Sequence, residues 1–416
     1  MNRIEPLGPD FGWLTFQWVH KAIFDLVENH GESHICLDFN RIQRAYPNGF
    51  VPLVVLVDRY RRDRGIHFEF VLPSEAKCQR AVLDNNWAAH LIPTGEFMLS
   101  AKPSALHRFL DDISLNDLVN RQIRQVLESA TYAQGVLQSF EWALNEVAGN
   151  VLVHAGVAHG WMQVAVHPKS HHMAIVVADG GLGIPETIRK AYANTALDRD
   201  EDAIAFALKE GITSRPDFGQ GKGLTGTLEI VKKNSGGRLA VHSREGMVEW
   251  AHDRLSIHGD FPPFPGTLVD IQLNTSEPID VERALWGSAP GYPFNESIFG
   301  KDTPVGVMRL QLVKEATGFG NRLTGQRIRT TIENLLTTAP SDVLEIDFTG
   351  VALIASSFAD EVFGKLAVSL GFIGFASRLK LVGLNKFCRG IIDDAVQSRI
   401  VQSRSGSPDD SSQSSH

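Results

Sequence analysis

Cysteine is scarce in this sequence of 416 residues. The sequence also contains neither a long apolar run nor an excess of positive charge. The three cysteines, Cys36, Cys78 and Cys388, lie far apart and form no Cys-x-x-Cys pair, which excludes a disulfide framework and a zinc knuckle and fits a reducing compartment. The longest apolar run, Phe50 to Val57, contains a proline and is far too short to cross a bilayer.

The formal net charge is −8, which argues against a broad nucleic-acid surface. The N-terminus has no apolar stretch of the kind found in signal peptides. We therefore expect a cytoplasmic protein with neither a membrane span nor a nucleic-acid partner. A local basic run, Arg59 to Arg64, is interpreted as the solvated end of a helix, with a polyanion site as the alternative.

Two segments near the ends of the chain repeat one order of elements, and in both the first strand ends in Asp-Phe. The elements are strand His34–Phe39, helix Gly49–Arg64, strand Ile66–Val71 and helix Ser74–Leu91, then strand Val343–Phe348, helix Ser357–Ser369, strand Leu379–Val382 and helix Asn385–Val396. Strands that alternate with helices predict a partly parallel α/β sheet in each segment. The matching order favours a duplication, although two unrelated α/β segments would look similar at this level.

The middle of the chain has a different pattern, with two helical stretches followed by several strands. We expect helices at Ser104–Val126 and Tyr132–His154, a hairpin of Trp161–Val166 and His172–Ala178, and strands at Arg238–His242, Val248–Trp250 and Thr267–Leu273. The segment 274–303 is rich in Pro, Gly and Ser and suggests a linker. The low-complexity tail is expected to be disordered.

Glu146 and Asn150 lie four residues apart in the second helical stretch, so they share one side of the helix, and His154 continues that side. An amide oxygen is a suitable ligand for Mg²⁺, and a carboxylate can orient or deprotonate a nucleophile. Taken alone, the pair also fits an exposed polar helix face.

A strand that ends in Asp179 is followed by glycines at alternate positions, Gly181 and Gly183. The carboxylate can accept a hydrogen bond from an exocyclic amine, and the glycines permit the backbone to approach a flat ligand closely. A tight turn is the alternative explanation of this motif.

Glycines recur further along the chain at Gly219, Gly221 and Gly223, with Lys222 among them and Leu224 directly after. Backbone N–H groups that lead into a helix can hold phosphates, and the lysine adds positive charge. A Gly-x-Gly-x-x-Gly spacing that starts at residue 221 also matches a dinucleotide-binding fingerprint. That alternative fails because the fingerprint follows a strand directly, whereas the preceding residues are polar and contain proline.

Together, these motifs resemble those of the GHKL ATPases, which include gyrase-type topoisomerases, MutL-type repair proteins, sensor histidine kinases and anti-sigma switch kinases. Glu146 and Asn150 match the N box, Asp179 begins the DxGxG box, and the later glycines match the GxGxG box. Gly266-Thr267, which opens the last strand, is similar to the closing Gly-Thr element of the family. The resemblance covers about residues 104–273.

This resemblance implies a Bergerat-type α/β sandwich with a mixed sheet that binds ATP and Mg²⁺. Glu146 would be the catalytic base, Asn150 would hold Mg²⁺, and Asp179 would contact the adenine amine with Thr267 nearby. The other nucleotide-binding residues that it implies are Gly181, Gly183, Gly219, Gly221, Lys222, Gly223 and Leu224.

The segment Glu345–Glu361 resembles the STAS-like domain, a group that includes the anti-anti-sigma factors. In those proteins a Ser between a strand and a helix is phosphorylated by a GHKL switch kinase. Ser356 and Ser357 stand at this junction and are candidate phosphoacceptors, but Ala355 and Phe358 depart from the usual Asp-Ser-Ser/Thr-Gly. A helix N-cap is the alternative role of the two serines.

We therefore predict a STAS-like domain at 1–103, a GHKL ATPase domain at 104–275, a linker at 276–303, a second STAS-like domain at 304–402 and a disordered tail at 403–416. The N-terminal copy has Pro47-Asn48 at the position of the serines. Since it offers no hydroxyl there, we expect it to be an interaction module.

Three functions remain open for such a cytoplasmic signalling protein. It is a switch-type kinase that phosphorylates Ser or Thr on a STAS-type or sigma-regulatory partner or on itself, an ATP-hydrolysing clamp, or a nucleotide-gated interaction module without turnover. Glu146 favours the two catalytic functions, and the lack of a transducer-like segment counts against the clamp. His20 and His107 lack the context of a histidine-kinase phosphoacceptor. GHKL switch proteins are often dimers, so a homodimer is one expected assembly.

Overall fold

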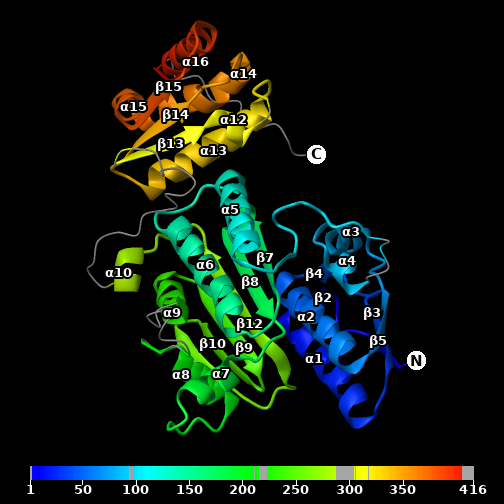
Figure 1. The fold of residues 1–416 in the computed structure, drawn as a ribbon. Helices are drawn as coiled ribbons and strands as arrows, with labels where there is room; N and C mark the ends of the chain where they lie inside the picture. Colours follow the sequence, from blue (N-terminus) through cyan, green and yellow to red (C-terminus); the bar gives the residue numbers. More distant parts are fainter. Residues whose placement is uncertain are drawn as a thin grey trace. The chain divides into compact units, whose positions relative to one another are not determined.

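The computed structural model describes residues 2–92, 95, 97–209, 211–212, 214, 223–286, 304, 306–316 and 318–404. They form two compact units, which are considered separately (Figure 1). Unit 1 holds the described residues within Met1–Gln125 and Ala133–Tyr292, and unit 2 those within Val126–Tyr132 and Pro293–His416. None of the helices in these ranges combines the length and apolar character needed to span a bilayer. The domain boundaries drawn from the sequence remain predictions.

The first part of unit 1 has a parallel three-stranded sheet of order β1-β3-β5 and a short pair, β2 and β4. Its elements are β1 (Asn2–Ile4), β2 (Asp10–Phe11), α1 (Trp13–Phe24), the π-helix η1 (Asp25–Asn29), β3 (His34–Asp38), β4 (Arg44–Ala45), α2 (Pro47–Arg64), β5 (His67–Val71), α3 (Ala76–Asp84) and α4 (Trp87–Leu91). The single helix predicted for Ser74–Leu91 is two helices. Asn86 interrupts it with a φ of 63°, and its side chain donates to the carbonyl of Leu106 at 3.1 Å.

The second part of unit 1 has a seven-stranded sheet of order β11-β10-β9-β12-β8-β7-β6. Its elements are β6 (His107–Phe109), α5 (Asp112–Ser129, whose last turn belongs to unit 2), α6 (Val136–His154), β7 (Gly160–His167), the 3₁₀ turn η2 (Pro168–Ser170), β8 (His172–Asp179), α7 (Ile184–Ala191), α8 (Asp200–Ala207), α9 (Gly223–Lys233), β9 (Arg238–Arg244), β10 (Gly246–Ala251), β11 (Arg254–His258), β12 (Phe264–Asn274) and α10 (Val281–Trp286). Residues 107–109, predicted to be helical, instead form a strand because they pair with the start of β7.

The mixed sheet predicted for this part is wrong, because every strand pair in it is antiparallel. The helices between β8 and β9 return the chain to a strand that runs parallel to β8. However, β12 is inserted between these two strands and pairs antiparallel with both. A helical crossover therefore produces no parallel pair here.

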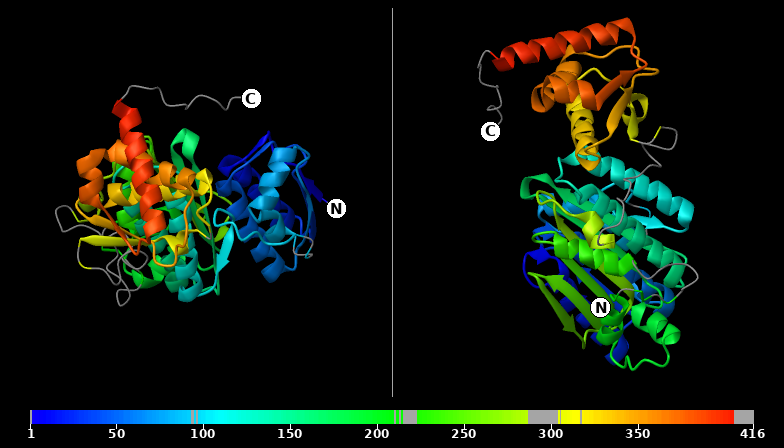
Figure 2. Two further views of the ribbon diagram at one scale, coloured as in Figure 1. Left: turned by 90° about the horizontal axis from the view of Figure 1, so that it is seen from above. Right: turned by 90° about the vertical axis from the view of Figure 1, so that its left-hand side faces the viewer.

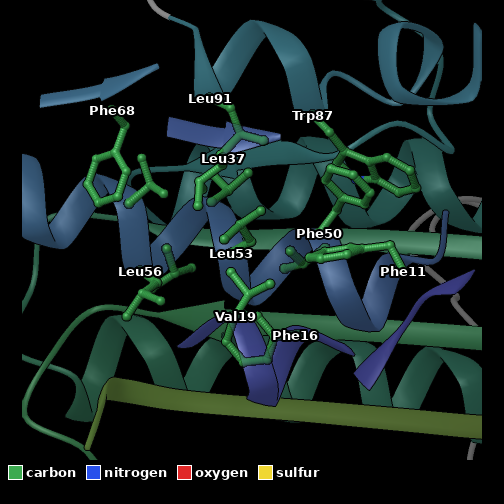
Figure 3. Packing of buried hydrophobic residues seen from close by; sticks show 14 of the residues in the cluster. Phe11, Phe16, Val19, Leu37, Phe50, Leu53, Leu56, Phe68, Trp87 and Leu91 are labelled. Carbon is green, nitrogen blue, oxygen red and sulfur yellow. The ribbon is translucent and has the colours of Figure 1, made fainter. Parts of the chain in front are cut away.

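Helix α2 is buried on all sides from Gly49 to Val57, unlike a surface helix, which is apolar on one face only. It packs against β7, β8 and β12 of the seven-stranded sheet and also contacts α1, α4 and β5. Figure 3 shows Phe50, Leu53 and Leu56 of α2 among residues of α1 and the three-stranded sheet. The ring of Phe50 stacks on that of Trp87, with centroids 4.5 Å apart. The apolar run of this helix thus fills the core of unit 1.

The basic run at the end of α2 is only partly solvated, which corrects the sequence interpretation. Arg59 Nη1 donates to the carbonyl of Gly180 at 2.9 Å. Arg61 Nη2 donates to the carbonyl of Leu91 at 2.7 Å, and its guanidinium lies over the ring of Phe70. These contacts attach the helix end to the seven-stranded sheet and to α4.

Unit 2 has a second parallel sheet of three strands, in the order β13-β14-β15. Its elements are β13 (Val307–Gln311), α12 (Leu312–Glu315), α13 (Arg322–Thr338), β14 (Val343–Asp347), α14 (Ser356–Ala359), the π-helix η3 (Asp360–Gly364), α15 (Lys365–Arg378, kinked at Gly371), β15 (Leu379–Val382) and α16 (Lys386–Arg404). Helix α16, red in Figure 2, lies along α15 and η3.

The repeat predicted from the sequence is present as one strand order in both parallel sheets. Asp38 and Asp347 each end the central strand, and each carboxylate accepts a hydrogen bond from the backbone N–H two residues later, at 2.9 and 2.8 Å. The following residues, Phe39 and Phe348, are both buried. The Asp-Phe ends therefore mark equivalent strand-to-loop turns.

The two faces of the seven-stranded sheet are covered by different helices. Helices α6 and α9 pack on one face, and α2 packs on the other. Strand β8 is buried for almost its whole length, and β12 alternates buried and half-buried residues with none exposed, as expected for strands covered on both sides. Because side chains alternate along a strand, neighbouring residues of these strands point to different faces.

Candidate functional site

A cavity of about 550 Å³ lies in unit 1 beside helix α6, and we call it the α6 cavity. This volume is in the range of small-molecule sites, which is roughly 300–1,000 Å³. The predicted site residues that line it are Glu146, Asn150, Asp179, Gly183, Gly223, Leu224 and Thr267. Residues that are distant in the sequence thus converge on one cavity.

Helix α6 presents Glu146 and Asn150 to the cavity because its apolar residues occupy the opposite side. Leu144 and Ala148 are buried and do not line the cavity. Gly135 starts this helix with a φ of 81°, and a side chain there would overlap the carbonyl oxygen of Ile279. The backbone at the start of α6 therefore requires glycine.

Asp179 ends β8 as a buried carboxylate, with 3% of its surface exposed. Its Oδ1 accepts a hydrogen bond from the N–H of Gly181 at 2.8 Å, and the N–H of Thr267 also donates to the carboxylate. Burial raises the pKa of Asp179 to about 7, although both hydrogen bonds lower it. Buried carboxyl groups with a strongly shifted pKa often belong to functional sites.

Three glycines let the backbone close around this carboxylate. Gly266 has a φ of 84°, and a side chain there would overlap the carbonyl and Oδ1 of Asp179. A side chain at Gly181 would overlap the carbonyl of Ala155, and one at Gly183 would come within 2.7 Å of Ser243 Oγ. Glycine is needed at these three positions because neighbouring atoms lie too close for a side chain, in addition to any requirement of the turn for glycine.

Ser243, at the end of β9, is a residue of this region that the sequence analysis missed. Its hydroxyl donates to the carbonyl of Gly266 at 2.7 Å, lies 3.3 Å from Thr267 Oγ1 and accepts from the N–H of Ile184 at 3.0 Å. It therefore joins β12 to the start of α7. No local motif marks this serine, because its role depends on the pairing of β9 with β12.

Glu146 also lines the cavity, close to the start of α9. A side chain added at Gly223 would overlap Glu146 Oε2, so the carboxylate lies against the backbone there. Burial also raises the pKa of Glu146 above its usual range. At the end of α6, His154 Nδ1 lies 2.8 Å from Ser214 Oγ.

Gly219, Gly221 and Lys222 lie outside the described residues, so the structure bears only on the last part of the third glycine motif. In the ranges that are described, no group of three or more His, Cys, Asp or Glu side chains could hold a metal ion. Asn150 lines the α6 cavity together with the carboxylates of Glu146 and Asp179, but these side chains do not belong to a metal-binding group of that kind within the described ranges.

The two candidate phosphoacceptors lie in unit 2, at the start of α14. Ala355 is the N-cap residue, and no side-chain hydrogen bond caps this helix. The alternative role of the serines as N-cap residues is therefore wrong. Ser356 is exposed and Ser357 is half-buried. In the N-terminal repeat, Pro47 and Asn48 occupy the same places at the start of α2.

The fold and the comparisons define a mixed α/β protein with several sheets and a STAS-like domain. The STAS-like domain is placed by a family model described as "STAS-like domain of unknown function (DUF4325)", which matches residues 324–386. This range runs from α13 to the start of α16 and includes both serines. No curated protein matches the chain, and no family model of a GHKL ATPase is found in it.

Proposed function

We propose that the α6 cavity is a GHKL-type site for ATP and Mg²⁺, and that the protein is a switch-type Ser/Thr protein kinase. Its substrate would be a STAS-type partner, such as a sigma-regulatory protein, or its own STAS-like domain. The observation that carries the proposal is the convergence of Asp179, Thr267, Glu146 and Asn150 on one cavity of nucleotide size.

Asp179 and Thr267 supply the part of the lining that suits an adenine base. A buried carboxylate is a strong acceptor for an exocyclic amine, because it has little competing water. Gly183 and Gly266 keep the surrounding backbone free of side chains, as a planar ligand requires. The donor and acceptor set that is present therefore fits a purine.

Glu146 and Asn150 supply the part of the lining that suits phosphate chemistry. Gly223 begins α9, and the N-terminus of a helix of 11 residues favours anions. Glu146, beside this helix start, would accept the proton of the attacking hydroxyl, and its raised pKa makes it a stronger base. Asn150 would contribute an amide oxygen to Mg²⁺, which neutralises charge on the phosphates when bound.

The STAS-like match favours a protein kinase over an ATP-hydrolysing clamp. Ser356 is exposed at the first turn of α14, so its hydroxyl is accessible to a kinase domain. A phosphate at this position would lie near a helix N-terminus, where negative charge is stabilised.

Incubation of the full chain with γ-labelled ATP and Mg²⁺ tests the proposal. We expect label on wild-type protein, none on Glu146→Gln, and none on the double variant Ser356→Ala/Ser357→Ala. Ser377→Ala, which removes an exposed serine elsewhere in unit 2, is the matched control and should keep the label. Where the substrate is another chain, label appears on an added STAS-type protein instead.

Other outcomes separate the alternatives. Release of free phosphate without label on any protein would support the clamp. Saturable ATP binding with neither product would support a nucleotide-gated module. No ATP binding at all, or binding unchanged in Asp179→Asn, would contradict the assignment of the α6 cavity.

A further inference from the structure

Helix α2 and the α6 cavity lie on opposite faces of strand β8. Val176 and Ala178 belong to the buried cluster that contains the apolar residues of α2, whereas Val177, between them, lines the α6 cavity. Side chains alternate between the two faces along a strand. A contact from α2 to the end of β8 therefore reaches the site from the face opposite the cavity.

Arg59, near the end of α2, makes such a contact with the backbone that follows β8. Its Nη1 donates a hydrogen bond of 2.9 Å to the carbonyl of Gly180. Its Nε forms an ion pair with Asp63, one helical turn later, so the guanidinium is held at two points. Gly180 is buried, and a Cβ atom there would touch Val55, Arg59 and Arg62 of α2. The end of the helix therefore covers this glycine.

One peptide group, between Gly180 and Gly181, connects this contact to the carboxylate of Asp179. Its carbonyl accepts from Arg59, and its N–H donates to Asp179 Oδ1 at 2.8 Å. The peptide bond is trans, so its carbonyl and its N–H point in opposite directions. Arg59 and the carboxylate are thus hydrogen-bonded to the two sides of one rigid plane.

This peptide plane needs an external contact because both of its residues are glycine. Without side chains, a rotation that turns the plane over meets little hindrance. Such a rotation would take the N–H of Gly181 away from Asp179 and leave this buried carboxylate with the N–H of Thr267. The guanidinium opposes the rotation, since a charge-assisted hydrogen bond is stronger than a neutral one. It also polarises the peptide, which makes the N–H of Gly181 a better donor.

We propose that Arg59 is a positioning residue for the nucleotide site, which orients the carboxylate of Asp179 toward the adenine amine through the Gly180–Gly181 peptide. This inference rests on the function proposed for the α6 cavity. It adds that the end of α2, a helix of the N-terminal part of unit 1, is required for a site to which it contributes no lining residue.

The pKa of Asp179 in the full chain without nucleotide tests the positioning role by itself. Burial raises this pKa to about 7, and the hydrogen bond from Gly181 lowers it. Arg59→Met keeps the apolar stem of a half-buried side chain but frees the peptide, so the pKa should rise by at least about half a unit. Carbon-13 NMR of protein labelled at the aspartate carboxyl carbons measures this pKa, and the signal that is missing in Asp179→Asn identifies the residue.

Arg62→Met is the matched control for the loss of a positive charge beside the same glycine. The guanidinium of Arg62 is hydrogen-bonded to Asp58 at 3.0 Å, so its removal should leave the pKa of Asp179 unchanged. Both variants keep the other titratable groups that line the α6 cavity, which are Asp112, Glu146 and His154. An unchanged pKa in Arg59→Met, or an equal rise in Arg62→Met, would overturn the positioning role.

Calorimetric titration of the same proteins with ATP and Mg²⁺ tests the link to the nucleotide site. Arg59→Met should bind ATP at least about fivefold more weakly than wild type, and Arg62→Met should bind it equally well. If wild type does not bind ATP, the function proposed for the α6 cavity fails, while the pKa still decides whether Arg59 positions Asp179. If wild type binds ATP and Arg59→Met binds it with the same affinity, the link between Arg59 and the nucleotide site is overturned.

Discussion

Replacement of Asp179 by asparagine should stabilise unit 1 at alkaline pH and abolish its stabilisation by ATP. Burial raises the pKa of Asp179 from its usual 3.8 to about 7. The folded state therefore binds the proton of this carboxyl more tightly than the unfolded state does. The resulting contribution to stability is complete below the usual pKa of 3.8 and is lost as the pH rises through about 7.

The size of the effect follows from the two pKa values. Above pH 7, the ionised carboxylate destabilises the folded state by about 4 kcal/mol relative to the protonated one. Asparagine carries no charge but cannot accept both backbone hydrogen bonds, which costs about 1 kcal/mol. The variant should therefore be more stable than wild type by about 3 kcal/mol at about pH 8, and by only about 0.5 kcal/mol at about pH 5.

Urea unfolding followed by tryptophan fluorescence measures this difference at both pH values, with and without ATP and Mg²⁺. Wild type should gain stability from ATP according to the ratio of ligand concentration to its dissociation constant, and the variant should not. If the stability difference between the two proteins does not change with pH, Asp179 is not the proton-linked group. If the variant still responds to ATP like wild type, the contact with adenine is wrong.

Three further substitutions test other parts of the molecule. Glu146→Gln should retain nucleotide affinity within about threefold and lose at least about 100-fold in turnover. A pH–rate profile of the wild type should show the rate rising with pH through the raised pKa of Glu146. Gly266→Ala should lower the free energy of unfolding by more than about 3 kcal/mol. Gly65→Ala is the control and should cost only about 1 kcal/mol, because Gly65 has a similar positive φ but open space around it. Similar losses for both variants in urea unfolding would refute the claim that the backbone around Gly266 leaves no room for a side chain. Asn334→Leu should lower the free energy of unfolding of unit 2 by about 3 kcal/mol, because the amide makes three hydrogen bonds of 2.8–3.0 Å to the backbone of 127–132. Hydrogen exchange of the backbone amides in that segment should accelerate. Unchanged exchange would count against this role of Asn334.

The sequence was sufficient to predict those elements whose pattern is local. The hairpin of β7 and β8 follows from two apolar runs separated by Pro168, and α6 follows from its helical spacing. Strand β12 was predicted as a strand, but its insertion between β8 and β9 was not, and the mixed-sheet prediction failed for that reason. Strand order depends on contacts that are distant along the chain, and periodicity carries no information about them.

The same distinction applies to individual residues. Glu146, Asn150 and Asp179 could be singled out because each belongs to a short motif with fixed spacing. Ser243 could not, since its three hydrogen-bonding contacts come from segments distant in the sequence. Arg59 was assigned to solvent for a similar reason, because a charge run does not reveal that a carbonyl of another segment lies within reach.

The alternation of residues along β12 has a consequence for genetics. Thr267 and Val269 line the α6 cavity, whereas Asp270 and Gln272 lie on the opposite face of the sheet, toward α1 and the start of α2. A library of all single substitutions across this strand should therefore yield two classes of phenotype that interleave, so that adjacent codons such as 269 and 270 fall into different classes. Suppressors of a defect at Asp270 would then be sought among codons for α1 and the start of α2, and those of a defect at Val269 among codons for α6.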